Sequence, residues 1–200
     1  MLNLIEPWLV FRPDLSKEMI KEFKPALRFL GIFVGLYLVL NFLYGWWIER
    51  YDVADPATVL VTKQSSWLLN VMGEETYTKP KLNTRTISIY KGSRIVVNVF
   101  EGCNGINVAI VFISFMLAFG GDRKKIIWFI PLGLVLIHFA NLLRVSGLFL
   151  VAEYFEQYFY YVHKYAFTAS IYVMVFLLWW IWIEKINGIS VRKAISHDKS

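Results

Sequence analysis

The chain has little cysteine: Cys103 is the only one among 200 residues. A single cysteine cannot form an internal disulfide, and neither a CxxC motif nor a Cys/His zinc spacing is present. We therefore expect no disulfide framework and no metal ion. Charge is scarce as well, at 18% of the residues against about 25% in ordinary soluble domains, whereas 57% of the residues are hydrophobic. This balance is typical of an integral membrane protein.

The formal net charge of +6 does not indicate nucleic-acid binding. Nucleic-acid binding proteins carry a basic stripe interleaved with exposed aromatic side chains, and this sequence has none. In a membrane protein a positive excess more often marks the cytoplasmic loops.

Four segments are free of charge for long enough to cross a bilayer, which takes about 20 residues. They are Phe29–Trp47, Asn104–Gly121, Ile126–Leu143 and Tyr165–Ile183. The first is too long, and its leader too acidic, for a cleaved signal peptide, and it is interpreted as an anchor. The expected fold class is an all-α polytopic membrane protein of about four transmembrane helices. Five segments are predicted. They are an N-terminal segment (1–28), the first transmembrane helix (29–47), a helix–hairpin insertion (48–103), a three-helix membrane core (104–184) and a C-terminal tail (185–200).

The basic residues near the helix ends predict the orientation of the chain in the membrane. They cluster at positions 12–28, at 123–125 and at 185–199. All three clusters lie in the cytoplasm if the chain crosses four times with both termini inside. The 48–103 segment also has basic residues, but long loops translocate largely regardless of charge. We therefore expect residues 1–28 and 185–200 in the cytoplasm and 48–103 outside.

The extracytoplasmic segment 48–103 is expected to be ordered. Asp55 as a cap and Pro56 at the first helical position predict a helix that ends at Gly73. Its apolar residues suggest an amphipathic helix that lies on the membrane or on its neighbours; they are Val59, Trp67, Leu68 and Val71. The stretch "TISIYKGSRIVVNVF" then predicts a β-hairpin about a Gly-Ser turn. In the N-terminal 28 residues a short interfacial helix is expected around Leu15–Phe23.

Cys103 follows the second predicted strand, at the outer start of the second membrane helix. At a helix N-terminus, free amides and the helix dipole lower the pKa of a thiol and favour the thiolate. Gly102 and Gly105 allow a close backbone approach. The alternative is that a lone cysteine in a membrane protein is an inert, small apolar residue.

Arg144 is the only charged residue between Ile126 and Glu153. At about 1.5 Å per residue it lies about 27 Å from Ile126, just under the outer surface and level with Cys103. Placing an arginine within a membrane span costs free energy, so the default interpretation is a functional residue with a partner. The alternative is an arginine whose side chain snorkels to the membrane interface. Asn141 shares its face and is expected to hold the guanidinium. His138 lies a further turn inward, where a hydrogen bond within the bundle is expected.

His163 opens the fourth span, also on the outer side, within the aromatic stretch "YFYYVHKY". Alone it reads as an interfacial histidine in an aromatic belt. The predicted topology, however, places Cys103, Arg144 and His163 at one depth, on three helices. Thiol and imidazole together are the groups of nucleophilic acyl transfer. Arginine cannot act as a base but can stabilise a thiolate or an oxyanion, joined by the amides of Asn104 and Gly105.

From about Asp55 to Trp182 the sequence resembles the exosortase and archaeosortase family of membrane cysteine transpeptidases. The resemblance rests on the stretches "DPATVLVTKQSSWLLNVMG", "VFEGCNG" and "HFANLLRVSGLFLVAEYF", followed by His163. It implies Cys103 as nucleophile, Arg144 as catalytic arginine and His163 as third residue. The chain departs from the family pattern in its four spans, where many members have more, and in Asn104, where serine is more usual.

The resemblance implies a membrane-embedded cysteine protease or transpeptidase that cleaves the C-terminal sorting signal of exported proteins through a thioester, without a cofactor. Its partners would be substrates whose tail joins a short motif, a transmembrane helix and a basic end, together with membrane lipid. Its active site would face the outside of the cytoplasmic membrane. Two other classes remain open: a non-catalytic assembly protein, which leaves Arg144 unexplained, and a small transporter, which should show repeated halves.

Overall fold

The computed structural model describes residues 13–81 and 84–186. Its longer elements are α1 (Pro13–Ile48), α2 (Pro56–Val71), β1 (Thr76–Pro80), β2 (Thr86–Lys91), β3 (Arg94–Phe100), α3 (Ile106–Phe119), α4 (Arg123–Tyr154) and α6 (Phe167–Ile181). Short turns join them: the 3₁₀ turns Glu101–Cys103 and Glu156–Tyr158, the single turn α5 (Phe159–Tyr161), and the π-helical segments Val162–Ala166 and Trp182–Ile186.

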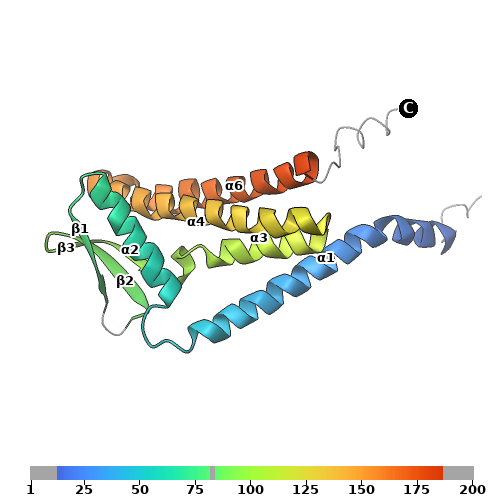
Figure 1. Cartoon of the computed structure of the whole chain (residues 1–200), viewed down its shortest axis with the longest axis horizontal. Coiled ribbons are helices and arrows are strands. Elements are labelled where there is room, and N and C mark those ends of the chain that lie inside the picture. Colours follow the sequence, from blue (N-terminus) through green and yellow to red (C-terminus); the bar gives the residue numbers. More distant parts are fainter. Residues whose placement is uncertain (1–12, 82–83, 187–200) are drawn as a thin grey trace, which may run out of the picture.

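Helices α3, α4 and α6 lie side by side, and α1 runs along α3 and diverges from the bundle toward α2 (Figure 1). Helix α2 and the sheet cover one end of this bundle. The loop between α3 and α4 lies at the other end (Figure 1). We call the end that carries α2 and the sheet the capped end, and the end at the α3–α4 loop the loop end.

Three helical segments are long and apolar enough to cross a membrane: Phe23–Ile48, Arg123–Tyr154 and Glu156–Ile186. The chain is therefore a multi-pass membrane protein. The fourth predicted span, Asn104–Gly121, forms the 14-residue helix α3. At about 1.5 Å per residue it is about 21 Å long, shorter than the ~30 Å hydrocarbon core. Glycines in left-handed or extended positive-φ conformations end it on both sides, so the fourth crossing stays a prediction.

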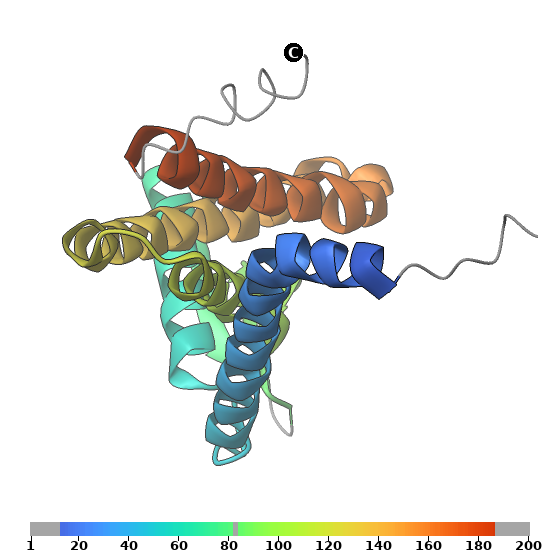
Figure 2. The same ribbon diagram turned by 90° about the vertical axis from the view of Figure 1, so that its right-hand side faces the viewer.

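Helix α1 is continuous from Pro13 to Ile48, so the helix predicted around Leu15–Phe23 is present but is the start of α1. The ribbon of α1 bends sharply near its N-terminal end (Figure 2). Pro25 is the proline inside this helix. A proline removes one helical hydrogen bond and its ring clashes with the carbonyl four residues earlier, which explains a bend there. Residues 1–12 and 187–200, with most of the predicted C-terminal tail, lie outside the described residues.

The predicted helix after Asp55 is confirmed. Asp55 accepts hydrogen bonds from the backbone amides of Ala57 and Thr58, and Pro56 opens α2. Trp67 and Val71 are each 66% exposed, so this part of the predicted apolar face does not pack on neighbouring elements, and its contact with the membrane stays a prediction. The buried residues are small and mainly polar: Thr58, Val61, Thr62, Ser65, Ser66 and Leu69. Their small volume allows α2 to lie close to α4.

The predicted hairpin is confirmed as β2 and β3, with the turn at Gly92 and Ser93. A strand absent from the prediction, β1, pairs antiparallel with β2 and completes a three-stranded sheet of order β1-β2-β3. Its sequence "TYTKP" is too short and polar to stand out as a strand. Asn70 at the end of α2 holds β1 through hydrogen bonds with the backbone N–H and carbonyl of Thr76.

Two apolar clusters stabilise these parts. One joins α2, the strands β2 and β3, and α4 around Cys103; its buried members include Val61, Leu69, Ile89, Val99 and Phe149. The other fills the bundle between α3, α4 and α6, with Phe112, Met116, Phe129, Ile137 and Trp182 at its centre. Because the first cluster spans both the bundle and its cap, the segment that carries Cys103 is packed from both sides.

Salt bridges and hydrogen bonds also connect the cap, which consists of α2 and the sheet, to α4. Lys91 of β2 donates to Glu74, which follows α2, at 2.7 Å and lies 3.5 Å from Glu153 of α4. Arg94 pairs with Glu153, and the hydroxyl of Tyr154 donates to Glu74 at 2.6 Å. Hydrogen bonds from Lys91 and Tyr154 lower the pKa of Glu74, so this carboxylate stays charged over the physiological range.

Candidate active site

Cys103 ends the 3₁₀ turn that connects β3 to α3. The turn begins at Glu101, directly after the last residue of β3, and the thiol residue is only 6% exposed. Gly105 follows in a left-handed conformation with φ of +84°, which glycine adopts without strain. A Cβ added at Gly105 would lie 3.2 Å from Cγ of Asn141. Glycine at 105 thus allows both the reversal into α3 and the close approach of α4.

The predicted position of Cys103 at the helix N-terminus is wrong in detail, because the first residue of α3 is Ile106. Burial raises the pKa of the Cys103 thiol. This effect outweighs the charge of Arg144 and a backbone hydrogen bond at Phe100, which both lower the pKa. The expectation of a lowered pKa therefore fails as well, and the resting group is a neutral thiol.

Asn141 of α4 holds the backbone of the cysteine. Its side-chain amide donates to the carbonyl oxygen of Cys103 at 2.9 Å, and the residue is fully buried. The expectation that Asn141 holds the guanidinium of Arg144 is wrong. Its other polar atom, Oδ1, is buried and has no hydrogen-bond partner among the described residues. A buried acceptor without a partner is costly, so this atom keeps an unused hydrogen-bonding capacity close to the backbone of Cys103.

Asn104 is buried in a polar network that the sequence did not reveal. Its side-chain amide donates to the hydroxyl oxygen of Tyr44 in α1 at 2.6 Å and to that of Thr58 in α2 at 3.2 Å. Its Oδ1 accepts from the backbone N–H of Ile106 at 3.0 Å, and the Thr58 hydroxyl in turn donates to Asp55. One asparagine thus connects α1, the N-terminus of α2 and the start of α3. The "DPAT" cap was visible in the sequence, but its contact with Asn104 spans 46 positions.

Arg144 lies on α4 and is half-buried. Its charge acts electrostatically on both the Cys103 thiol and the His163 ring, but Arg144 is not among the residues that line the cavity which these two groups share. The Nε atom is buried and has no hydrogen-bond partner among the described residues. No salt bridge involving Arg144 is found in that part of the chain. The guanidinium therefore has donors that a bound group can use.

His163 lies in the π-helical segment Val162–Ala166, where its ring stacks on Phe159 at a centroid distance of 5.8 Å. Such π-helical turns are frequent at functional sites. Cys103 and His163 both line a cavity of about 290 Å³, whose walls come from β3, α4 and the start of the last span. Val97, Val99, Val145 and Leu148 give the cavity a mainly apolar lining.

His138 lies apart from this cavity, as expected. Its Nε2 is 2.7 Å from Oε1 of Gln64 in α2, which connects α4 to the cap. The hydrogen bond predicted for His138 is thus present, but its partner belongs to the cap and not to another helix of the bundle.

The fold and the site together define a multi-pass membrane protein in which a thiol and an imidazole line one cavity beneath an ordered cap, within electrostatic range of a guanidinium. A sequence model of the transmembrane exosortase family matches residues 22–182, a range that includes all three groups. The chain belongs to this family, and membership indicates a membrane transpeptidase or protease role. Comparisons with curated proteins and with solved structures each found no match.

Proposed function

We propose that the protein is a cysteine transpeptidase or protease that removes the C-terminal sorting tail of exported proteins at the outer face of the cytoplasmic membrane. The observation that carries the proposal is the shared cavity of Cys103 and His163, with the charge of Arg144 acting on both. Family membership supports the substrate class, because exosortases act on exported proteins with C-terminal sorting signals.

The raised pKa of Cys103 determines how the reaction begins. Because the resting thiol is neutral, His163 takes its proton as the sulfur attacks the scissile carbonyl carbon. The new C–S bond forms, the carbonyl oxygen becomes an oxyanion, and Arg144 stabilises this negative charge. His163 then returns the proton to the leaving amine as the C–N bond breaks. The thioester on Cys103 is released by a second nucleophile, an amine, a hydroxyl group or water.

The supporting residues hold the nucleophile and the oxyanion site. Asn141 fixes the carbonyl of Cys103 through its side-chain amide. The backbone N–H of Asn104 donates to the carbonyl of Glu101 at the long distance of 3.4 Å, so this hydrogen bond is weak. This amide and that of Gly105 are the proposed backbone donors to the oxyanion, as expected from the sequence. Asn104 positions both through its bonds to Tyr44 and Thr58.

The test is coproduction of the full chain with exported proteins of the source organism that end in a motif, a transmembrane helix and a basic tail. We expect Cys103→Ser to leave the protein inserted in the membrane while the tail stays uncleaved, with a loss on the order of a thousandfold or more. The wild type should also form a conjugate with its substrate that hydroxylamine cleaves, as a thioester requires.

The matched control moves the thiol instead of deleting it. Cys103→Ser combined with Ser93→Cys keeps one cysteine on the same side of the predicted topology, in the exposed turn of the hairpin. This variant should be as inactive as Cys103→Ser alone. Processing at the wild-type rate by either variant would contradict the proposal and favour a non-catalytic assembly protein.

A further inference from the structure

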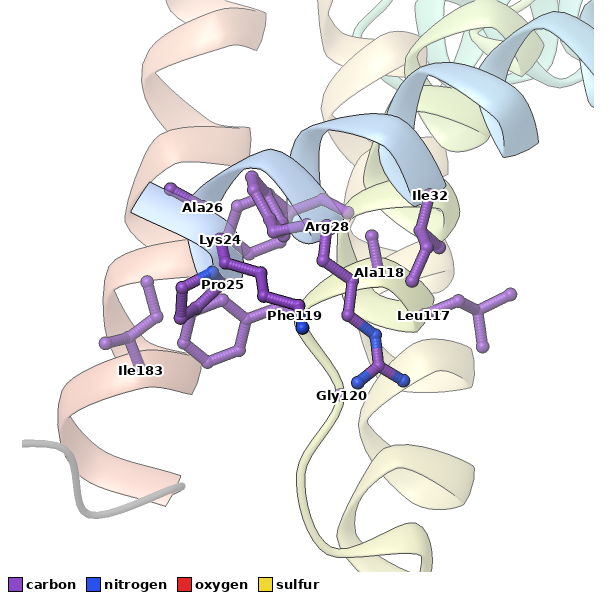
Figure 3. A pocket seen from close by; sticks show the side chains of 12 residues that line it. Lys24, Pro25, Ala26, Arg28, Ile32, Leu117, Ala118, Phe119, Gly120 and Ile183 are labelled. Atoms are coloured by element: carbon purple, nitrogen blue, oxygen red, sulfur yellow. The ribbon is translucent and has the colours of Figure 1, made fainter. Parts of the chain in front are cut away.

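A second concave site lies at the loop end of the bundle, far along α3 from Cys103. It is a groove of about 930 Å³ between α1, the C-terminal end of α3 and the last turn of the final span. Figure 3 shows its walls, with Ile32, Leu117 and Ile183 among the apolar side chains. Its volume lies at the upper end of the range for small-molecule sites, about 300–1,000 Å³.

Two cations lie at the rim of this groove. Lys24 and Arg28 are four residues apart on α1 and therefore on one face of the helix. In the view of Figure 3 both side chains extend from α1 toward the end of α3 at Phe119 and Gly120. Among residues 23–81 and 84–186, whose side chains the structure describes, neither has a salt-bridge partner. Like charges at this spacing repel each other, so an anion between them would stabilise the pair.

The surroundings strengthen the positive potential. Arg123, Lys124 and Lys125 open α4 directly after the Gly120–Gly121 turn, and Lys185 ends the last span. Among residues 23–81 and 84–186, the acidic residues of the same end are Asp122, which caps α4 by accepting from the backbone N–H of Lys124, and Glu184. Among these described side chains, basic ones outnumber acidic ones around the mouth of the groove.

We propose that this groove binds one anionic glycerophospholipid. Its phosphate lies between Lys24 and Arg28, and an acyl chain follows the apolar wall toward Phe29, Phe115 and Ile183. A basic peptide tail would be repelled by the two cations. A zwitterionic lipid has no net negative charge, because its own ammonium group accompanies the phosphate and would be repelled by the two cations. Free phosphate would leave the apolar wall uncovered. Basic pockets between helices are a known chemistry for anionic lipid headgroups.

The bound lipid would fasten α1 to the rest of the bundle at the bend near Pro25, where α1 is otherwise exposed. This inference does not depend on the proposed peptidase reaction, because the groove contains none of the proposed catalytic residues. With the predicted orientation the groove faces the cytoplasmic leaflet, whose surface carries anionic lipids.

The test is native mass spectrometry of the full-length protein released from detergent, titrated with dioleoyl phosphatidylglycerol or dioleoyl phosphatidylcholine. The wild type should retain one phosphatidylglycerol tightly and phosphatidylcholine weakly. Lys24→Gln with Arg28→Gln should bind phosphatidylglycerol about 30-fold more weakly, since each basic residue near the membrane surface contributes about 1 kcal/mol. The charge-matched control is Arg123→Gln with Lys124→Gln, which should change binding only a few-fold.

A second variant leaves every charge in place. Ala118→Trp adds bulk to the apolar wall and should reduce retention of both lipids, even though Lys24 and Arg28 are intact. Equal retention of the two lipids by the wild type would overturn the proposal. So would an equal loss in the two double variants, which would indicate a diffuse surface charge. Displacement of the lipid by millimolar inorganic phosphate would identify a phosphate site instead.

Discussion

The two ends of helix α3 are built in opposite ways. At the capped end, buried amide groups form hydrogen bonds between elements: Asn104 bonds to α1 and α2, and Nδ2 of Asn141 bonds to the carbonyl of Cys103. Two cations of the sheet, Lys91 and Arg94, are paired with carboxylates. At the loop end, Lys24 and Arg28 are exposed and flank an open apolar groove, and neither has a salt-bridge partner among residues 23–81 and 84–186.

This difference separates two kinds of recognition. Buried hydrogen-bonded groups have one arrangement, because any displacement leaves a polar atom without a partner. Such an end can hold a reacting carbonyl in a single geometry. An exposed cation pair over an apolar groove tolerates movement and recognises a class of molecules by charge and hydrophobicity. The capped end is therefore suited to chemistry and the loop end to lipid.

The largest expected effect concerns the sides of the membrane on which the capped end and the loop end lie. In a Cys103→Ala background, Ser93→Cys and Gln157→Cys at the capped end should react with an impermeant maleimide added to intact cells. Lys124→Cys at the loop end should react only after the membrane is opened. The expected difference is all-or-none. Labelling of Lys124→Cys from outside would refute the predicted orientation and the fourth crossing by α3.

The next largest effect is expected at Arg144. If Arg144 stabilises the oxyanion, Arg144→Lys loses directed donors that a point charge cannot replace, and turnover should fall about a hundred- to a thousandfold. If Arg144 only snorkels, lysine is an adequate substitute. The measurement is the rate of tail removal per amount of inserted protein. Activity within a few-fold of the wild type would favour snorkelling.

A smaller effect is expected when the backbone at the capped end is strained. Gly105→Ala forces a side chain into a left-handed conformation, which costs about 1–2 kcal/mol, and brings Cβ to 3.2 Å from Asn141. The thermal midpoint in detergent should therefore decrease. The matched control is Gly45→Ala in α1, where nothing lies within 4 Å of the new Cβ and the midpoint should stay or rise. An equal change in both variants would contradict the close contact with α4.

The smallest expected effect needs no substrate. Because the charge of Arg144 lowers the pKa of Cys103 against the larger effect of burial, Arg144→Gln should raise that pKa further. The midpoint of the pH dependence of iodoacetamide alkylation should then move to higher pH, since only the thiolate reacts. Lys164→Gln removes an exposed cation next to His163 and should leave the midpoint unchanged. An unshifted midpoint in Arg144→Gln would place the guanidinium away from the thiol.

Several features of this protein follow from local sequence. The long apolar segments predict membrane helices because apolar length alone meets the thickness of the bilayer, and three of them are long helices in the structure. Asp55 with Pro56 predicts the start of α2, and Gly92 with Ser93 predicts the turn between β2 and β3. Each of these signals lies within a few residues, where capping, turn geometry and periodicity act.

Other features depend on contacts between distant residues. The length of α3 is limited by the glycines at 105 and 120, and a Cβ at Gly105 would lie only 3.2 Å from Asn141 of α4. The hydrogen bond from Asn141 to the carbonyl of Cys103 joins residues 38 positions apart, and it depends on how α4 packs against the 3₁₀ turn. The raised pKa of Cys103 is likewise an effect of burial, which a sequence motif does not record.

The sequence by itself determined that this chain crosses a membrane, that it carries one thiol after a strand, and that a single arginine interrupts a long apolar helix. Apolar runs, turn residues and isolated charges act locally, so their consequences can be read from neighbouring positions. Only the tertiary structure decided which groups share the cavity of Cys103, which polar atoms are paired, and where an open basic groove remains. Hydrogen bonds and burial join segments far apart in the chain, and their geometry exists only once the helices have packed.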